Sequence, residues 1–271
     1  MIKQAIIPLA GLGTRLLPLT SVMPKELMPI NGKPNLQYIL DECTEAGVKE
    51  FIFIISKKKL SIKKYFFNDS FYKKIIKKKK DKRLLEEYKK IKRYQKMIKF
   101  VYQNKPKGTG DAVLKCQKFI KDKYFLMLLP DDLIIKKNCS KEMIRLHKKT
   151  NGSIIATKRV ERKTVSRWGI LSIENKKKRY FQIKDVVEKP SIKKAPSNFA
   201  IIGRYILPTK IFGEIKKLKP GQGGEIHITD AIRSLIKKEN KFYGNIFKGK
   251  YLDCGTLSGY INSGIQIFKG K

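Results

Sequence analysis

The first sixty residues place one segment of helical periodicity between two short apolar runs, and this order limits the folds open to the chain. Residues 3–9 form an apolar run that ends in Ala10-Gly11-Leu12-Gly13, which indicates a buried strand and a tight turn. Residues 35–46 carry apolar side chains at helical spacing, and residues 51–55 are apolar throughout. A strand, a helix and a second strand in this order form a parallel unit that is covered on both faces. The predicted class is therefore α/β.

The later segments continue this pattern in two halves. Residues 57–99 are dense in lysine and carry Leu84, Tyr88, Ile91 and Gln95 along one helical side, so we interpret them as a helical insertion. Up to about residue 157, further strands are expected at 99–102, 124–129 and 153–157, and helices at 111–120 and 139–149. From about 158 to 271, strands are expected at 169–173, 183–187, 200–206 and 245–248, and helices at 225–238, with Thr229 as N-cap, and at 257–268. We predict one domain over 1–271, built on a Rossmann-like mixed, mainly parallel sheet flanked by helices.

The formal net charge of +39 raises the possibility of a nucleic-acid partner. All but ten of the 62 basic residues are lysine, and they are spread over nearly every predicted surface segment. The chain lacks the signatures of an RRM, a zinc finger or a helix-turn-helix, and the basic insertion has few aromatic residues arranged for base stacking. A genome-wide bias toward lysine explains the charge more simply, and no nucleic-acid partner is predicted.

Cysteine and histidine usage bears on location and on metal chemistry. The four cysteines are scattered and form no CxxC pair, which is typical of reduced thiols in a cytoplasmic protein. No apolar run reaches the ~20 residues needed to cross a bilayer, and the N-terminus does not resemble a signal peptide. His147 and His227 are too far apart to suggest a histidine metal site. Any metal would use carboxylates, which favours Mg²⁺.

The turn after the first strand has the features of a phosphate-binding loop. Gly11 and Gly13 allow backbone N–H groups to approach an anion, and Arg15 and Lys25 supply a guanidinium and an ammonium group. The loop is not a dinucleotide fingerprint, because Leu16 stands where the third glycine is required. It is not a Walker A loop either, because the final Gly-Lys-Ser/Thr is missing. A chain of phosphates is the ligand that this loop favours.

Carboxylates stand at two places where strands are expected to end. Asp131 follows the apolar run 124–129, at the edge where open α/β sheets bind ligands. Asp253 follows a second short apolar stretch, and the two carboxylates together with phosphate oxygens suit Mg²⁺. Asp132 is the neighbouring alternative, and register favours Asp131. The sequence alone does not establish that positions 131 and 253 meet.

These motifs make the chain similar to the sugar-1-phosphate nucleotidylyltransferases, and within them to the bacterial UTP–glucose-1-phosphate uridylyltransferases. The resemblance covers essentially the whole chain, including the insertion, and rests on Ala10-Gly11-Leu12-Gly13-Thr14-Arg15-Leu16-Leu17-Pro18, Pro24-Lys25-Glu26-Leu27, Gln103 with Lys107-Gly108, Leu129-Pro130-Asp131, Val187-Glu188-Lys189-Pro190, the segment 195–205, and Gly224-Glu225-Ile226 with Thr229-Asp230. Thymidylyltransferase relatives usually carry Gln at the position of Glu26, so the resemblance favours UTP over dTTP. Trp168 replaces the more usual Tyr before Gly169.

The resemblance implies a reaction and a set of roles. UTP and glucose 1-phosphate would react with Mg²⁺ by in-line attack on the α-phosphorus, giving UDP-glucose and pyrophosphate. The nucleotide would be bound by the Gly13 loop together with Ala10, Gly11, Glu26, Gln103 and Gly108. The sugar phosphate would be bound by Gly169, Glu188 and Lys189. The catalytic groups would be Arg15, Lys25, Asp131 and Lys189, with Asp131 and Asp253 as metal ligands.

The family also often forms dimers or tetramers, so a homo-oligomer is expected. Three alternatives remain: a thymidylyltransferase or a pyrophosphorylase for another sugar 1-phosphate, a basic nucleic-acid-binding protein, and an inactive nucleotide-sensing relative. The presence of Arg15, Lys25, Asp131 and Asp253 argues against the inactive relative.

Overall fold

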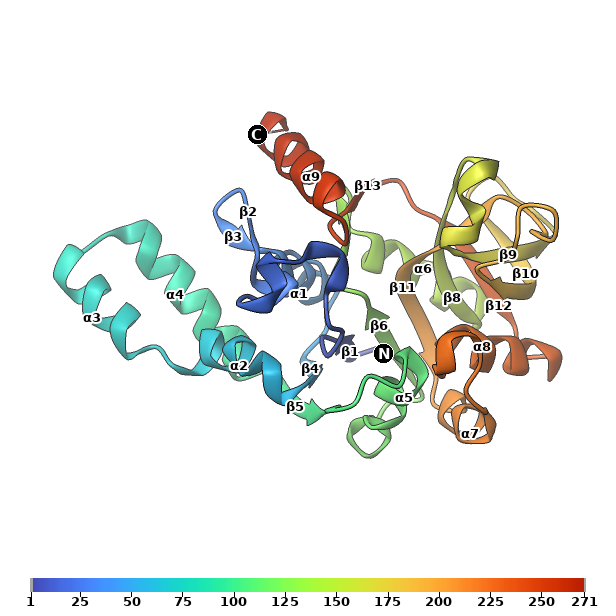
Figure 1. Ribbon diagram of the computed structural model, residues 1–271, viewed down its shortest axis with the longest axis horizontal. Coiled ribbons are helices and arrows are strands. Elements are labelled where there is room, and N and C mark those ends of the chain that lie inside the picture. The colour runs from blue at the N-terminus through green and yellow to red at the C-terminus, as the bar shows by residue number, and fades with distance from the viewer. Residues whose placement is uncertain (1, 271) are drawn as a thin grey trace.

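The structure is a computed structural model that describes residues 2–270, and a nine-stranded sheet forms its centre (Figure 1). The strands lie in the spatial order β5 (Ile98–Tyr102), β4 (Glu50–Ile55), β1 (Gln4–Pro8), β6 (Tyr124–Leu128), β11 (Phe199–Pro208), β8 (Ser153–Arg159), β12 (Phe242–Ile246), β10 (Tyr180–Glu188) and β9 (Gly169–Glu174). Because β11 pairs with both β6 and β8, it joins the two predicted halves into one sheet.

The strand directions confirm a mixed α/β sheet, in which seven of the nine strands run in the same direction. The neighbours β5, β4, β1 and β6 are parallel to one another. β11 is antiparallel to both β6 and β8, so β8 runs in the same direction as β6. β12 is parallel to β8. β10 is antiparallel to both β12 and β9. The parallel βαβ unit predicted for the N-terminal segment is therefore present, and every antiparallel pairing within this sheet involves a strand of the second half.

Helices cover both faces of the sheet. In β1, Ile6 and Ile7 are both fully buried and face opposite sides, as expected for successive residues of a strand. Ile7 belongs to a cluster formed with α1 (Asn35–Glu45) and α6 (Cys139–Thr150). Ile6 belongs to a second cluster formed with α5 (Thr109–Leu114), α7 (Ile211–Lys217) and α8 (Ile228–Lys237). This two-sided burial explains the continuous apolar run in the sequence.

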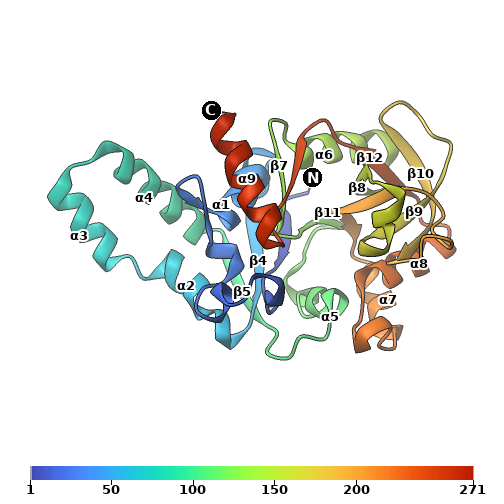
Figure 2. The same ribbon diagram turned by 45° about the horizontal axis from the view of Figure 1, so that its top comes forward.

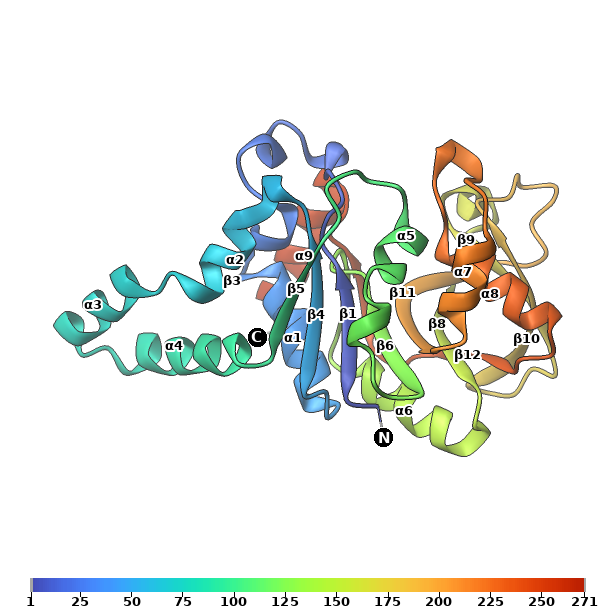
Figure 3. The same cartoon turned by 90° about the horizontal axis from the view of Figure 1, so that it is seen from below.

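The lysine-dense segment that we interpret as an insertion is helical. It comprises α2 (Leu60–Phe67), α3 (Ser70–Lys79) and α4 (Lys82–Gln95), and it extends sideways from the edge of the sheet next to β5 (Figures 1 and 3). Ile91 and Tyr94 of α4 are buried and Leu84 and Tyr88 are partly buried, while most of its lysines are at least partly exposed. Within residues 2–270, no helix has both the length and the apolar character required to cross a bilayer.

Several boundaries differ from the predictions. Thr229 is not an N-cap: α8 begins at Ile228 with His227 at the cap position, and the Thr229 hydroxyl instead donates a hydrogen bond to Glu188. The helix expected at 111–120 ends at Leu114 and is followed by a 3₁₀ turn. The sequence did not predict α7, or the strand β7 (Asp132–Ile135), which pairs with β13 (Lys250–Asp253). After β13, α9 (Leu257–Lys269) projects from the sheet with the C-terminus at its outer end (Figure 2).

Candidate active site

The glycine loop after β1 folds back on itself and directs two cations to one place. Gly13 adopts a left-handed conformation with φ of 72° and precedes the short 3₁₀ turn that carries Arg15. The Thr20 hydroxyl donates a 2.8 Å hydrogen bond to the Gly13 carbonyl, which closes the loop. A later 3₁₀ turn, Lys25–Leu27, follows Pro24 and carries Lys25. The loop is therefore locally ordered by a positive-φ glycine and a side-chain hydrogen bond.

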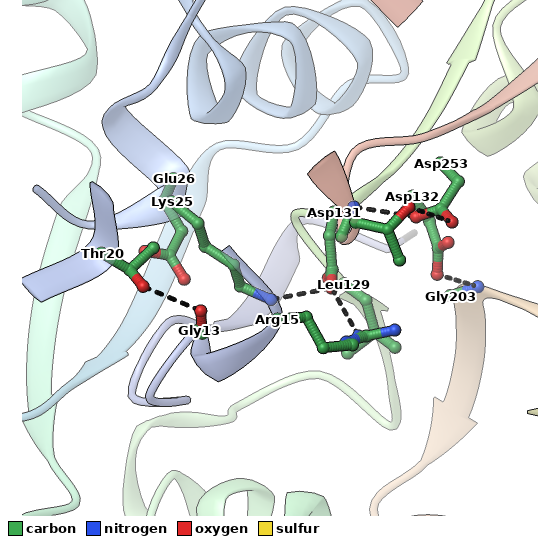
Figure 4. A network of polar contacts seen from close by, with 12 residues as sticks. Gly13, Arg15, Thr20, Lys25, Glu26, Leu129, Asp131, Asp132, Gly203 and Asp253 are labelled. Carbon is green, nitrogen blue, oxygen red and sulfur yellow. Dashed lines mark hydrogen bonds and ion pairs between the residues drawn. The ribbon is translucent and has the colours of Figure 1, made fainter. Parts of the chain in front are cut away.

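Asp131 is the point at which these cations converge (Figure 4). The ammonium of Lys25 lies 2.7 Å from Asp131 Oδ2, and Nη2 of Arg15 lies 3.7 Å from the same oxygen. Burial alone would raise the pKa of Asp131, but the charge and hydrogen bond of Lys25, with a smaller contribution from Arg15, lower it below its usual value. Lys25 is mostly buried, whereas Arg15 is 64% exposed and so remains accessible to a ligand.

The second carboxylate, Asp253, is brought to Asp131 by the β7–β13 ladder, which the sequence did not predict. Asp253 pairs in register with Asp132, and the Cys254 N–H donates to the Asp131 carbonyl at 2.8 Å. A Cβ atom at Gly255 would lie 2.9 Å from Asp131 Oδ2, 3.2 Å from Asp253 Oδ1 and 3.3 Å from Arg15 Nη2. Two carboxylates and a guanidinium therefore surround Gly255, whose N–H donates a 2.8 Å hydrogen bond to Asp253 Oδ1.

Asp132 has a different environment from its neighbour. Its Oδ1 accepts a 2.6 Å hydrogen bond from the Tyr251 hydroxyl, and its Oδ2 accepts a 3.1 Å hydrogen bond from the Gly203 N–H. Burial, together with the nearby Asp131 charge, raises the pKa of Asp132 to about 6. Both oxygens of Asp132 thus accept hydrogen bonds from uncharged groups of the protein, whereas Asp131 Oδ2 is paired with two cations that line the cavities described next.

Two cavities meet at Asp131. The first has a volume of about 230 Å³ and contains six of the predicted residues among its lining: Ala10, Gly11, Lys25, Glu26, Gln103 and Gly108. The second has a volume of about 380 Å³ and contains four more of them: Arg15, Gly169, Glu188 and Asp253. Asp131 and Leu129 line both cavities. The structure therefore gathers the predicted nucleotide residues on one side of Asp131 and the predicted sugar residues on the other.

The far wall of the first cavity is built around Gly108. The Gln103 amide donates to Asp111 at 2.7 Å and to the Gly108 carbonyl at 3.2 Å, which fixes the plane of the amide. Gly108 has φ of 95° and ψ of 173°, a region that only glycine adopts readily. A Cβ atom there would lie 2.5 Å from the Ile226 carbonyl oxygen. Glycine is required at this position by both conformation and space.

We predict that Gly108→Ala lowers the free energy of unfolding by about 1–3 kcal/mol and, if the first cavity receives a nucleotide, raises the KM of that nucleotide. Thermal unfolding and initial-rate kinetics measure the two effects. Gly47→Ala is the matched control, because Gly47 also has a positive φ, 96°, but has open space around it and lies outside both cavities. The control should lose stability and keep the wild-type KM. Equal KM values for Gly108→Ala and wild type would contradict the role of this wall.

Glu26 enters the first cavity as part of a buried ion pair that the sequence did not predict. Glu26 is 1% exposed, and both of its oxygens accept hydrogen bonds of 2.8 Å from the ammonium of Lys59. Burial raises the pKa of Glu26, and the charges of Lys59 and Lys25 oppose that rise. In the sequence Lys59 is one lysine in the run 57–59, so nothing in the pattern distinguished it from its exposed neighbours.

On the other side of Asp131, the predicted sugar-binding residues Gly169 and Glu188 lie in the wall of the second cavity. Glu188 Oε2 accepts a 2.9 Å hydrogen bond from the Thr229 hydroxyl. A Cβ atom at Gly169 would lie 3.3 Å from that same oxygen, so the backbone of Gly169 and the carboxylate are close. Trp168, which replaces the more usual Tyr, is accommodated beside Gly169. Its ring packs edge-on against the ring of Tyr251, with 6.0 Å between the ring centroids. Thr229, Trp168 and Tyr251 are lining residues that sequence reasoning did not assign.

Two predicted residues do not line either cavity. Lys189 is exposed, has φ of 43°, and donates its backbone N–H to the Trp168 carbonyl at 3.0 Å. Gly13 contributes through the shape of the loop rather than through the cavity wall. The other predicted site residues all lie at the two cavities.

The donor set at Asp131 and Asp253 fits a hard divalent cation. In the described part of the chain, no group of three or more His, Cys, Asp or Glu residues is arranged to hold a metal. A hard divalent cation held here would draw on these two carboxylates and complete its shell with phosphate oxygens and water.

The sequence is similar to proteins of known activity along nearly its whole length. The pattern of the family described as Nucleotidyl transferase matches residues 4–269. The UTP–glucose-1-phosphate uridylyltransferase of Bacillus subtilis (strain 168) is 38% identical over 98% of this chain and 91% of its own length. The UTP–glucose-1-phosphate uridylyltransferase of Mycoplasma genitalium is 37% identical over 97% of this chain and 91% of its own length.

Solved structures give the same result. A UDP-glucose pyrophosphorylase complexed with UDP-glucose has a TM-score of 0.89 and 36% identity, and the match covers 100% of both chains. The UTP-bound UGPase from Acinetobacter baumannii has a TM-score of 0.89 and 30% identity, over 98% of this chain and 93% of that one. Because the family pattern and these relatives extend over almost the full length, the chain belongs to the nucleotidyl transferase family.

Proposed function

We propose that this protein transfers the uridylyl group of UTP to glucose 1-phosphate, forming UDP-glucose and releasing pyrophosphate. The observation that carries the proposal is the pair of cavities joined at Asp131, one beside the glycine loop and one beside Gly169 and Glu188. A nucleotide in the first cavity and a sugar phosphate in the second would present their phosphates at the same carboxylate. The similarity to UTP–glucose-1-phosphate uridylyltransferases supports this choice of substrates.

In this proposal the first cavity holds the nucleoside. The backbone of Ala10 and Gly11 approaches it, and Glu26, Gln103 and Gly108 face the uracil. Both hydrogen bonds from the Gln103 amide nitrogen are used within the protein. Among residues 2–270, its amide oxygen has no hydrogen-bond partner, so it can accept one from a bound base.

The reaction requires charge neutralisation rather than a protein nucleophile. A phosphate oxygen of glucose 1-phosphate forms a bond to the α-phosphorus of UTP, and the bond from that phosphorus to the β-phosphate bridging oxygen breaks. The attacking oxygen is already anionic at neutral pH, so no general base is needed. Arg15 and Lys25 hold the triphosphate and balance the charge on the departing pyrophosphate.

Asp131 and Asp253 are the proposed ligands of Mg²⁺, which when bound would neutralise phosphate charge at the reacting centre. Glu188 and Gly169 orient the glucose hydroxyls, and the Thr229 hydroxyl holds Glu188 in place. Lys189 is proposed to contact the sugar phosphate from its exposed position beside Trp168.

An assay of pyrophosphate release with UTP, glucose 1-phosphate and Mg²⁺ tests the proposal directly. We expect turnover that is lost on chelation of Mg²⁺ and restored when Mg²⁺ is added back, with UDP-glucose identified as product. Faster turnover with dTTP, or with another sugar 1-phosphate, would instead support the pyrophosphorylase alternatives. No turnover with any nucleotide and sugar phosphate would reject the proposal in favour of an inactive relative.

We predict that Glu26→Gln reduces the preference for UTP over dTTP by about tenfold or more, because an amide replaces a charged acceptor whose hydrogen bonds are worth ~1.5–3 kcal/mol. The ratio of kcat/KM for the two nucleotides, at saturating sugar phosphate, measures the effect. Glu225→Gln is the matched control, since Glu225 also lines the first cavity but is not paired with Lys59. An unchanged ratio in Glu26→Gln would remove this residue from base selection.

We further propose that the chain acts as a single domain, in a cytoplasmic homo-oligomer of two or four copies. Four large apolar side chains on α9 support association, because their spacing places them along one side of the helix and each is about half exposed or more: Leu257, Ile261, Ile265 and Phe268. All four cysteines are free and buried, which accords with a reducing compartment.

A further inference from the structure

A buried ion pair connects the helical insertion to the nucleotide cavity. Lys59 is the last residue of the 3₁₀ turn Lys57–Lys59, at the point where the chain leaves β4 and enters the insertion. Its ammonium lies 2.8 Å from each oxygen of Glu26, 33 residues earlier in the sequence. Lys59 is 7% exposed and Glu26 is 1% exposed, whereas the adjacent Lys57 and Lys58 are exposed. One lysine at the start of the insertion, Lys59, therefore contacts Glu26, a residue that lines the first cavity.

Such a pair needs an explanation other than stability, because burying two charges costs much of what their attraction returns. Its geometry provides one. Both oxygens of Glu26 share a single ammonium, which fixes the orientation of the carboxylate. An ionised carboxylate only accepts hydrogen bonds, whereas a neutral carboxyl group also donates one. The charge state of Glu26 therefore determines which ligand groups it can bind.

Other charged groups surround the pair. Lys25 is adjacent in the chain and interacts electrostatically with Glu26, and it shares Asp131 Oδ2 with Arg15. Glu225 lines the same cavity from the segment before α8. Lys59 donates hydrogen bonds to both oxygens of Glu26, whereas Lys25 donates a 2.7 Å hydrogen bond to Asp131.

We propose that Lys59 is a positioning residue for nucleotide recognition, holding Glu26 as an oriented, ionised acceptor for an N–H or O–H group of the nucleoside. The proposal rests on the proposed function, because it assumes that the first cavity receives the nucleotide. It also gives the insertion a role at the site, since the turn that begins the insertion supplies the cation.

The test replaces Lys59 with methionine and measures UTP binding by calorimetry and the KM for UTP between pH 6 and pH 9. Burial raises the pKa of Glu26 and Lys59 opposes that rise most strongly, so removing Lys59 raises this pKa further. Below the new pKa the carboxyl group is neutral. We expect Lys59→Met to bind UTP about tenfold or more weakly at pH 6, to recover affinity as the pH rises, and to change kcat less than KM. The wild type should vary much less over this range.

Three control variants separate positioning from folding. Lys58→Met removes an exposed neighbouring lysine and should leave the pH profile unchanged. Lys59→Arg keeps a buried cation and should restore most of the affinity at low pH. In the double variant Glu26→Gln/Lys59→Met, the extra pH dependence should disappear, because Gln does not titrate. Thermal unfolding of each variant confirms that the measured protein is folded.

Two results would overturn the proposal: UTP affinity in Lys59→Met equal to that of the wild type at every pH, or a pH dependence that persists in the double variant. The second result would assign the titration to another group. UTP binding and turnover by the wild type distinguish a failure of the proposed function from a failure of the proposal for Lys59. A wild-type protein that binds no UTP rejects both proposals, whereas one that binds and turns over UTP leaves the role of Lys59 to the variants.

Discussion

Lys25→Ala is expected to lower kcat by about 10²–10³-fold, the loss typical of removing one preorganised charge contact from a reacting centre. Lys25 is mostly buried, lines the first cavity and lies 2.7 Å from Asp131, so its charge is held where the pyrophosphate would depart. Burial alone would lower the pKa of Lys25, but Asp131 and Glu26 raise it, so the ammonium stays charged at neutral pH. The KM for UTP should change less than kcat, because the negative charge grows in the transition state.

Lys33→Ala is a suitable control for this prediction. Lys33 is also a partly buried lysine paired with an aspartate, Asp41, at 2.5 Å, but it lies outside both cavities. Its loss should leave kcat close to wild type. Turnover of Lys25→Ala within a few-fold of the wild type, in a protein that remains folded, would show that the ammonium does not act in the chemical step.

The fold was largely predictable because its core strands carry a strong local signal. β1, β4 and β6 are buried on both faces, so each appears in the sequence as an unbroken apolar run, and α1 between β1 and β4 has clear helical periodicity. The strands β7 and β13 are short, and each depends on the other for its hydrogen bonds. Pairing across more than a hundred residues leaves no periodic pattern in either segment, so this ladder was missed.

The site divides in the same way. Arg15, Lys25 and Gly11 belong to one continuous loop with recognisable spacing, and the structure brings Arg15 and Lys25 to Asp131. The meeting of Asp131 with Asp253 depends on the β7–β13 ladder, and the pairing of Glu26 with Lys59 depends on the path of the chain after β4. Both are tertiary contacts between distant residues. A local pattern suggests which residues carry charge, but it does not indicate which charges are buried together.

Asp131→Asn is expected to have the other large effect, a fall in kcat of about 10²–10³-fold with a higher Mg²⁺ concentration needed for half-maximal activity. The amide keeps the size of the side chain but removes the charge that faces the same point as Asp253. It also leaves the Lys25 ammonium without its carboxylate partner. Steady-state rates measured over a Mg²⁺ titration give both quantities.

The neighbouring variant Asp132→Asn makes this test specific, because the two aspartates are adjacent and differ in their contacts. Asp132 already accepts hydrogen bonds from Tyr251 and from the Gly203 N–H, and an amide nitrogen facing either donor leaves a buried group unsatisfied. We expect a loss of about 1–3 kcal/mol in the free energy of unfolding and an unchanged Mg²⁺ requirement. If Asp132→Asn shifted the Mg²⁺ requirement and Asp131→Asn did not, the metal ligand would be Asp132, and the assignment of Asp131 would be wrong.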